Sequence, residues 1–192
     1  MGKRRPTLRT ERLVLRPFRP SDAADVQLLA GAPEIADTTL SIPHPYEDGM
    51  AEAWIAGHRD RFGKGEEVVF AVQRLEDGAL IGSIGLRLRQ DHQRGELGYW
   101  IGRPYWGQGY CTEAARAVLR WAFRSMRLNR VYACHFARNP ASGRVMQKLG
   151  MRREGLLRAH VRKAEGFEDL VYYGMLRSDY AAAPAAEGEM GA

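Results

Sequence analysis

The chain has 192 residues, and its 29 Lys and Arg residues outnumber its 23 Asp and Glu residues, giving a formal net charge of +6. Hydrophobic residues make up 45% and charged residues 27%, which is typical of a globular protein and excludes wholesale disorder. Two cysteines are too few for a disulfide framework or a thiolate zinc site, and the longest apolar run, 68–72, is too short to span a bilayer. We therefore expect a cytoplasmic protein with no membrane partner and no metal.

Most of the chain is expected to form one domain. Residues 1–7 are predicted to be a flexible basic arm, and residues 181–192 are small and polar, which is typical of a disordered tail. No linker or repeat interrupts residues 8–180. The positive charge is scattered, and its one row at helical spacing is typical of a solvated helix face: Arg116, Arg120, Arg124 and Arg127. This pattern argues against a nucleic-acid partner, which remains only an alternative.

Hydrophobic periodicity predicts the elements of the first half of the chain. In chain order these are a strand over 13–18, a helix from 22, a helix over 51–62, and strands over 68–74 and 80–89 joined by a turn at 76–78. Ser21 is the expected cap of the first helix, with Asp22 in its first turn, where a carboxylate suits the helix dipole.

The second half continues the alternation of strands and helices. It contains predicted strands over 96–101 and 131–136, a helix over 112–126, a helix opened by Asn139 and closed at Gly150, and a hairpin of 156–163 with 167–176. The helix opened by Asn139 has the usual order of signals, with Asn at the N-cap, Pro140 at the first helical position and Gly after the last turn. The predicted class is mixed α/β.

The most informative segment is GYWIGRPYWGQGYCTEA, residues 98–114, which runs from a strand through a glycine loop into a helix. Such a junction directs several main-chain N–H groups and the positive end of the helix into one small space, which suits a diphosphate. The glycine spacing fits neither a dinucleotide-binding fold nor a P-loop. Two glycines alone are weak evidence, because most such loops are simply turns.

This segment resembles the acyl-CoA loop of the GNAT N-acetyltransferases, in particular their RimJ/RimL-type branch. Further segments similar to that branch occur in the family's order and extend the resemblance over residues 8–180: 8–18, 139–142, 148–151, 153–155 and 169–179. The resemblance implies a twisted, mostly antiparallel sheet with flanking helices and a splay between its two central strands. It also implies an enzyme that transfers an acetyl group directly from acetyl-CoA, without a metal, to a primary amine.

The resemblance also indicates which residues bind acetyl-CoA. The diphosphate cradle falls on Gly107, Gln108, Gly109, Tyr110, Cys111 and Thr112. The main chain of Tyr99, Trp100 and Ile101 is expected to pair with pantetheine, and the Asn139 side chain to contact it or only to cap its helix. Trp106 and Cys111 depart from the family pattern, but a loop that binds through main-chain amides tolerates such changes.

Candidate catalytic residues are fewer. The tyrosine that many relatives use to protonate the thiolate is replaced by Met146, so the resemblance assigns this role to Ser142, unless the serine only bonds within its helix turn. Glu96 is the best candidate base, because Glu96, Gly98 and Trp100 share one strand face. Weaker candidates are Asp169, His135, His160 and His44, and water is an alternative to all of them. Cys111 is not expected to be a nucleophile.

The acceptor is expected to be a primary amine, with the N-terminal α-amine of a ribosomal-type protein ahead of a polyamine or an antibiotic. An α-amine loses its proton near pH 8 and a lysine amine only near 10.4, so a site without a strong base handles the former more easily. Five residues with aromatic rings could line an acceptor cleft or could simply belong to the core: His44, Tyr46, Trp54, Trp100 and Phe167. A CoA-binding protein without catalysis and a homodimer remain open alternatives.

Overall fold

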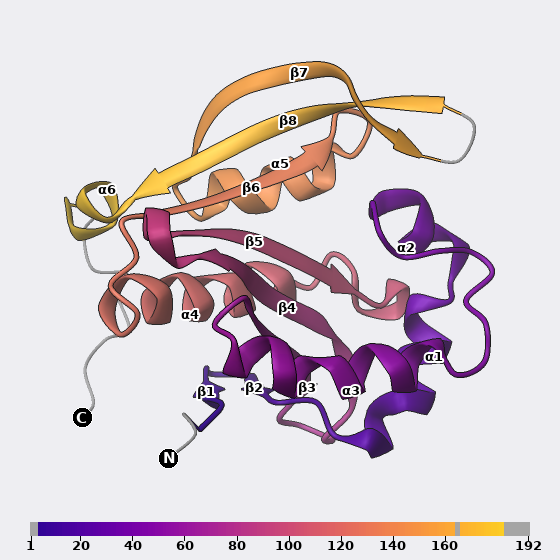
Figure 1. Ribbon diagram of the computed structural model, residues 1–192. Coiled ribbons are helices and arrows are strands. Elements are labelled where there is room, and N and C mark those ends of the chain that lie inside the picture. The colour runs from indigo at the N-terminus through magenta and orange to yellow at the C-terminus, as the bar shows by residue number, and fades with distance from the viewer. Residues whose placement is uncertain (1–3, 164–165, 183–192) are drawn as a thin grey trace.

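A single sheet of eight strands organises the computed structural model, which describes residues 4–163 and 166–182 (Figure 1). The strands are β1 (Leu8–Arg9), β2 (Leu13–Arg16), β3 (Glu67–Arg74), β4 (Leu80–Arg89), β5 (Arg94–Ile101), β6 (Arg130–Phe136), β7 (Arg152–Lys163) and β8 (Gly166–Leu176). Their order is β1-β2-β3-β4-β5-β6-β8-β7, and every neighbouring pair is antiparallel except β5 with β6.

The described residues form six α-helices, of which the first five lie between strands and the last follows β8: α1 (Ala23–Ala30), α2 (Pro33–Thr38), α3 (Met50–Gly63), α4 (Tyr110–Arg124), α5 (Pro140–Lys148) and α6 (Arg177–Ala182). The first three precede β3, α4 connects β5 to β6, and α5 connects β6 to β7. No helix in the described part of the chain is both long and apolar enough to cross a membrane.

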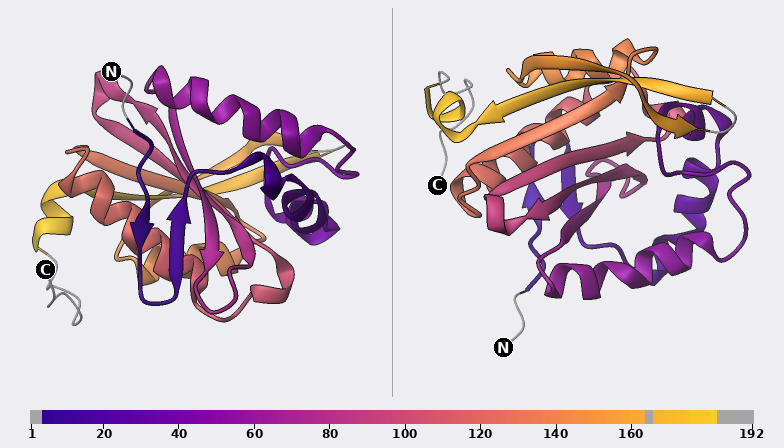
Figure 2. Two further views of the ribbon diagram at one scale, coloured as in Figure 1. Left: turned by 90° about the horizontal axis from the view of Figure 1, so that it is seen from below. Right: turned by 45° about the horizontal axis from the view of Figure 1, so that its top comes forward.

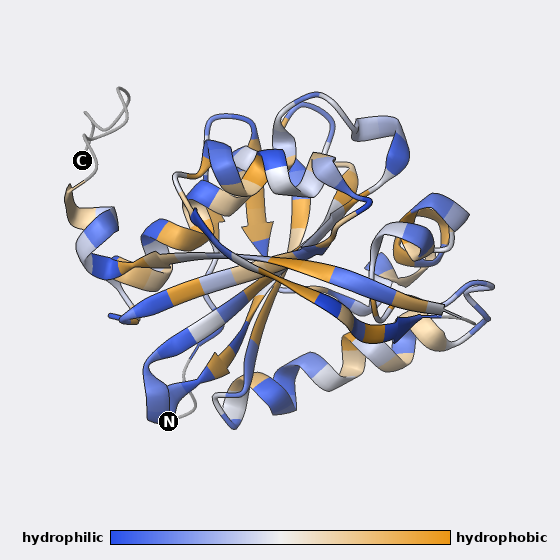
Figure 3. Cartoon of the chain, turned by 90° about the horizontal axis from the view of Figure 1, so that it is seen from above, coloured by the Kyte–Doolittle hydropathy of each residue, from blue (hydrophilic) through white to orange (hydrophobic). Residues whose placement is uncertain are grey.

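Helices cover both faces of the sheet. Alternate side chains of each strand point to opposite faces, so each strand contributes to the packing on both sides. Phe70, Ile84 and Leu86 pack on the face that carries α4 and α5, whereas Ala71 and Trp100 pack with α1 and α3. Figure 2 shows α3 and α4 on opposite sides of the strands. Figure 3 shows hydrophobic residues along the central strands and hydrophilic ones recurring along the helices. The buried residues form two clusters, one on each face of the sheet.

The predicted splay is present between β5 and β6. The two strands pair in parallel only at Arg94–Arg130, Gly95–Val131 and Glu96–Tyr132, and then separate. Figure 1 shows β6, β7 and β8 turning away from β4 and β5 beyond this point. The rest of β5 therefore has a ladder partner in β4 but none in β6. The expected mixed, mostly antiparallel sheet is confirmed.

The expectation that Ser21 caps the first helix is wrong. The helix begins at Ala23 after a short 3-10 turn, and no side chain caps it. Asp22 is buried, and it accepts hydrogen bonds from both terminal nitrogens of the Arg16 guanidinium, each at 2.8 Å, and from the Arg19 main-chain N–H at 2.7 Å. Charge-assisted bonds of this kind are stronger than a neutral helix cap.

Other helix boundaries differ from the predicted ones by a few residues. The six-residue α2 was not predicted, and α4 begins at Tyr110 and ends at Arg124, two residues before each predicted boundary. α6 includes Ala181 and Ala182, which were assigned to the tail. Of the predicted arm and tail, residues 1–3 and 183–192 lie outside the described ranges.

Candidate active site

The glycine loop and the first turns of α4 and α5 enclose a cleft of about 460 Å³, here called the loop cleft. It is lined by all the residues predicted to bind acetyl-CoA except Gln108: Tyr99, Trp100, Ile101, Gly107, Gly109, Tyr110, Cys111, Thr112 and Asn139. The Gln108 side chain instead donates to the Pro104 carbonyl at 3.1 Å. Two cations on α5, Arg144 and Lys148, also line the cleft. Sequence reasoning missed them, although their four-residue spacing on a predicted helix could have shown that they share a face.

Gly109 sets the direction of α4. Its φ of +83° lies in the left-handed region, which an L-residue adopts only at a cost. Because Gly109 turns the chain there, the helix begins at Tyr110, with its first main-chain N–H groups at the cleft. The first four N–H groups of a helix have no acceptor within that helix, and they carry its positive end. The loop cleft is therefore suited to a phosphate.

A polar clamp joins the N-terminal segment to α4. The Glu113 carboxylate accepts hydrogen bonds from the Thr10 hydroxyl at 2.6 Å, the Arg12 main-chain N–H at 2.9 Å and the Arg12 guanidinium at 2.7 Å. Burial alone would raise the pKa of Glu113, but these bonds lower it. Arg12 also lies over the Tyr110 ring, 4.5 Å from its centre. These contacts hold the start of α4 in place.

Ser142 lines the loop cleft from the first turn of α5. Its main-chain N–H donates to Asn139 Oδ1 at 3.3 Å, so Asn139 caps this helix and also lines the cleft. Its hydroxyl oxygen lies 2.9 Å from the Tyr99 hydroxyl, and burial raises the pKa of Tyr99 above its usual value. The Tyr99 side chain was not identified from the sequence, because only the fold brings residues 99 and 142 together.

Two other residues of this region have structural environments. Burial raises the pKa of the Cys111 thiol to about 12, so the thiol is protonated near neutral pH and is a poor nucleophile. Met146 is 1% exposed and belongs to the core under α4 and α5. Neither residue is placed to donate a proton in the cleft.

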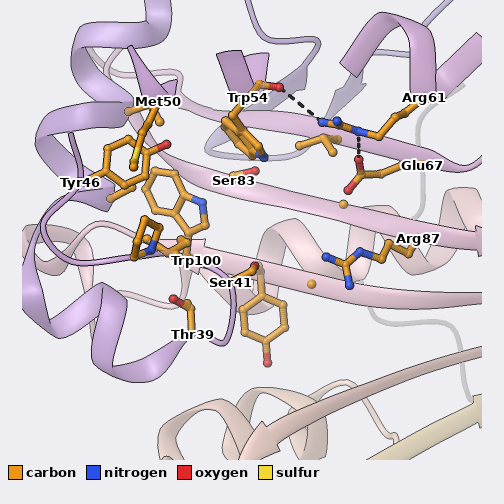
Figure 4. A pocket seen from close by; sticks show the side chains of 18 of the residues that line it. Thr39, Ser41, Tyr46, Met50, Trp54, Arg61, Glu67, Ser83, Arg87 and Trp100 are labelled. Carbon is orange, nitrogen blue, oxygen red and sulfur yellow. Dashed lines mark hydrogen bonds and ion pairs between the residues drawn. The ribbon is translucent and has the colours of Figure 1, made fainter. Parts of the chain in front are cut away.

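A second cleft, of about 570 Å³, lies between the sheet and α1, α3 and the loop after α2, and is here called the aromatic cleft (Figure 4). Tyr46, Trp54 and Trp100 line it, as predicted. The expected contributions of His44 and Phe167 are wrong: neither lines the cleft, His44 is bound to the Gly31 carbonyl at 3.1 Å, and Phe167 is 69% exposed.

The floor of the aromatic cleft consists of three rows across β3, β4 and β5. The middle row is Val69, Gly85 and Gly98, which pair in register. A side-chain carbon added at Gly98 would meet nothing within 4 Å. The cleft exists largely because this row has almost no side chains.

The row at one end of the floor is charged. Glu67 pairs in register with Arg87, and Arg87 pairs with Glu96, so three charged residues of alternating sign lie side by side on one face. Glu67 accepts a hydrogen bond from Arg61 of α3 at 2.7 Å, and Glu96 lies 3.4 Å from the Tyr132 hydroxyl. Figure 4 shows Arg61, Glu67 and Arg87 around the same space. Glu96, Gly98 and Trp100 line the cleft together, as their shared strand face predicted.

The weaker candidate bases have other partners, and none lines either cleft. His135 Nδ1 lies 2.8 Å from the Phe136 carbonyl, and Asp169 accepts from the Ala159 main-chain N–H at 2.7 Å. His160 packs edge-on against Tyr172. Among the described residues, no group of three His, Cys, Asp or Glu side chains could hold a metal ion.

The two clefts share Thr39, Tyr99 and Trp100. A ligand in the loop cleft and a ligand in the aromatic cleft would therefore meet beside the splayed part of β5. The arrangement provides helix-end amides and a serine–tyrosine hydroxyl pair on the side of the loop cleft, and a carboxylate on the side of the aromatic cleft. It suits a reaction between two bound molecules.

Comparison with known families identifies the class of protein. Residues 12–152 match the family model described as an acetyltransferase (GNAT) domain, so the chain belongs to the GNAT acetyltransferases, as its sequence indicated. A relative from Bacillus licheniformis, the N-acetyltransferase p20, is 30% identical over 177 residues, covering 91% of this chain and 98% of the relative. Acetyl-CoA is accordingly the expected acetyl donor of the loop cleft, whose residues fit it.

Solved structures agree. A GNAT-family acetyltransferase from Bacillus anthracis superposes with a TM-score of 0.81 at 25% identity, covering 90% of this chain and 99% of that one. The RimL ribosomal L7/L12 α-N-protein acetyltransferase in complex with coenzyme A (TM-score 0.83, 14% identity) and a spermidine N-acetyltransferase SpeG chimera from Vibrio cholerae (0.76, 20%) share the fold. The match with RimL covers 91% of this chain, the match with the SpeG chimera covers 89%, and each covers 99% of the solved chain. At such identities the likeness shows the fold alone.

Proposed function

We propose that this acetyltransferase acetylates a primary amine, and that the amine is the N-terminal α-amino group of a peptide or protein. The amine nitrogen attacks the thioester carbonyl, a C–N bond forms and the C–S bond breaks. The amine loses one proton and the departing thiolate gains one. The aromatic cleft would hold the acceptor and the loop cleft the donor, because they meet at Tyr99 and Trp100.

Ser142 is the proposed proton donor to the thiolate. Ser142 lines the loop cleft, and its hydroxyl is hydrogen-bonded at 2.9 Å to the hydroxyl of Tyr99, a residue that lines both clefts. Tyr99 could return a proton to Ser142 along this bond. Main-chain amides of β5 beyond Glu96, which have no partner in β6, are available to polarise the thioester carbonyl.

Glu96 is the proposed base for the amine, acting directly or through water. It lines the aromatic cleft on the same strand face as Trp100, at the point where β5 and β6 separate. An α-amine with a pKa near 8 needs only weak assistance at neutral pH, whereas a lysine amine needs far more.

The charge balance of the aromatic cleft carries the choice of acceptor. Its ionised side chains are two carboxylates, Glu67 and Glu96, and two guanidiniums, Arg61 and Arg87. Polyamines and aminoglycosides carry several positive charges and are attracted where carboxylates outnumber cations. Here Glu67 is already paired with Arg61, so only Glu96 is left for an incoming cation. A molecule with a single amine fits this balance better.

The test is a panel of acceptors at fixed acetyl-CoA. We expect turnover on short peptides with free N-termini, none on the same peptides with blocked N-termini, and weak turnover on spermidine and aminoglycosides. Turnover on the polyamines and antibiotics with none on free peptides would show a small-molecule acetyltransferase instead.

Two variants locate the acceptor and the base. Gly98→Val would fill the middle row of the cleft floor, raising the KM for the amine while leaving the Kd for acetyl-CoA within about twofold, since the added side chain meets only open space. Glu96→Gln should shift the acid-side limb of the pH–rate profile. Glu67→Gln, which removes the same charge from the same row, is the matched control. An unshifted limb in Glu96→Gln would give the role of base to water.

A further inference from the structure

Arg87 has an unusual position among the charged residues of the aromatic cleft. It is exposed, it lines the cleft, and it stands between two carboxylates in register, Glu67 and Glu96. Nevertheless, no ion pair joins its guanidinium to a carboxylate within the ranges that the structure describes. Glu67 is bound by Arg61 at 2.7 Å, and the hydrogen-bond partner of Glu96 is Tyr132.

This leaves a guanidinium and a carboxylate side by side on the cleft floor. Side chains directly opposite on neighbouring strands have Cβ atoms about 5 Å apart. A ligand whose amine lies near Glu96 can therefore place a second group, about one residue away, against Arg87. The planar guanidinium fork matches a carboxylate or phosphate better than any neutral acceptor group.

We propose that Arg87 is a specificity-determining residue that binds an anionic group of the acceptor. The preferred substrate is then a peptide whose free N-terminus is followed closely by an acidic side chain, at the first or second residue. This inference rests on the proposed function, in which the acceptor is an α-amine in the aromatic cleft. It adds the substrate class that the cleft selects among such amines.

The experiment measures kcat/KM for pairs of hexapeptides that differ only by Glu or Gln at the first or second residue. Wild type should favour the Glu peptide by about tenfold, which is the size of one hydrogen-bonded charge pair. In Arg87→Gln this ratio should fall to about one. Arg87→Glu should favour a Lys peptide over the Glu peptide. Arg89→Gln is the matched control, because Arg89 lies on the same strand two residues away and outside the cleft, next to Asp91. It should keep the wild-type ratio.

The ratio separates binding from folding, since a structural role of Arg87 would lower turnover on both peptides alike. Equal wild-type turnover on Glu and Gln peptides, or a ratio that survives in Arg87→Gln, overturns the role of Arg87 while the peptide acceptor stands. No turnover on any free peptide, with turnover on polyamines or antibiotics, overturns the proposed acceptor, and the inference about Arg87 with it.

Discussion

The two clefts that meet at Tyr99 and Trp100 are built differently. The loop cleft depends on main-chain geometry: a left-handed glycine, the N–H groups at the start of α4, and strand edges left open by the splay. The aromatic cleft depends on side chains from α1, α3 and the loop after α2, held against a floor with glycines in its middle row. Main-chain geometry suits a donor common to a family, whereas side chains can change with the acceptor.

The largest effect is expected at the hydrogen-bonded pair of Ser142 and Tyr99. Ser142→Ala should lower kcat by about 10²–10⁴-fold, because a general acid contributes mainly in the transition state. The Kd for acetyl-CoA, measured by calorimetry, should stay within a few-fold. Tyr99→Phe keeps the ring and removes the hydroxyl that lies 2.9 Å from Ser142, so it should lower kcat less. Equal kcat values for wild type and Ser142→Ala would exclude the serine from proton transfer.

The stability of the segment that leads into α1 is expected to depend on the buried Arg16–Asp22 ion pair. Asp22→Asn leaves the Arg16 guanidinium buried without its carboxylate, which should lower the free energy of unfolding by about 3 kcal/mol in urea titrations. Asp77→Asn, in the exposed pair with Arg74, is the control and should change little. Similar losses in both variants would mean that burial of the Arg16–Asp22 pair has no special weight.

A fall in pH should lower the free energy of unfolding through His58 of α3. This residue is 3% exposed, and its ring packs 4.4 Å from that of Trp54. Neither ring nitrogen has a hydrogen-bond partner among the residues that the structure describes. Burial, assisted by the charges of Arg61 and Arg5, lowers its pKa to about 4, against 6.5 when unperturbed. The unfolded chain therefore binds a proton first, and stability falls as the pH drops from about 6.5 towards 4, by about 3 kcal/mol.

His58→Phe keeps an aromatic ring in this position and should flatten that part of the stability profile. His92→Gln, at an exposed histidine, is the control and should retain the wild-type slope. If the slope persisted in His58→Phe, the acid sensitivity would have to come from another group.

The smallest effect is expected in the loop itself. Gly109→Ala places a Cβ on a residue with φ of +83°, a strain of about 1–2 kcal/mol, and should raise the Kd for acetyl-CoA about tenfold. Gly155→Ala is the control, because its new Cβ meets nothing within 4 Å and Gly155 has no positive φ. An unchanged Kd in Gly109→Ala would mean that the loop tolerates strain and that donor binding depends on other contacts.

The same contrast explains what could be predicted from the sequence. Asn139 and Gly150 are local signals, each required by the backbone at its own position, so the ends of α5 could be predicted. The glycine loop could be located in the same way, but α4 begins and ends two residues before the predicted boundaries. The splay came from the resemblance to the family, and the pairing of β5 with β6 agrees with it.

Contacts between residues far apart in the sequence, in the loop cleft and in the aromatic cleft alike, could not be predicted in the same detail. Helix packing brings Tyr99 to Ser142, and strand register places Arg87 between Glu67 and Glu96. Of the five aromatic residues considered from the sequence, Tyr46, Trp54 and Trp100 line the cleft, whereas His44 and Phe167 do not. The type of side chain alone does not determine which rings face a cleft. The prediction that Ser21 caps α1 was wrong because the neighbouring Asp22 carboxylate is bound by the buried Arg16 guanidinium.

The separation of β5 from β6 has a consequence for dynamics. Beyond Glu96 and Tyr132, two strands in the middle of the sheet face each other without ladder hydrogen bonds, as edge strands do. Amides directed into this gap should therefore exchange with deuterium quickly in the free protein, although they lie at the centre of the fold. A bound donor that spans the gap would protect them and raise the melting temperature through mass action. The largest slowing of exchange should occur in the middle of the sheet rather than at its rim.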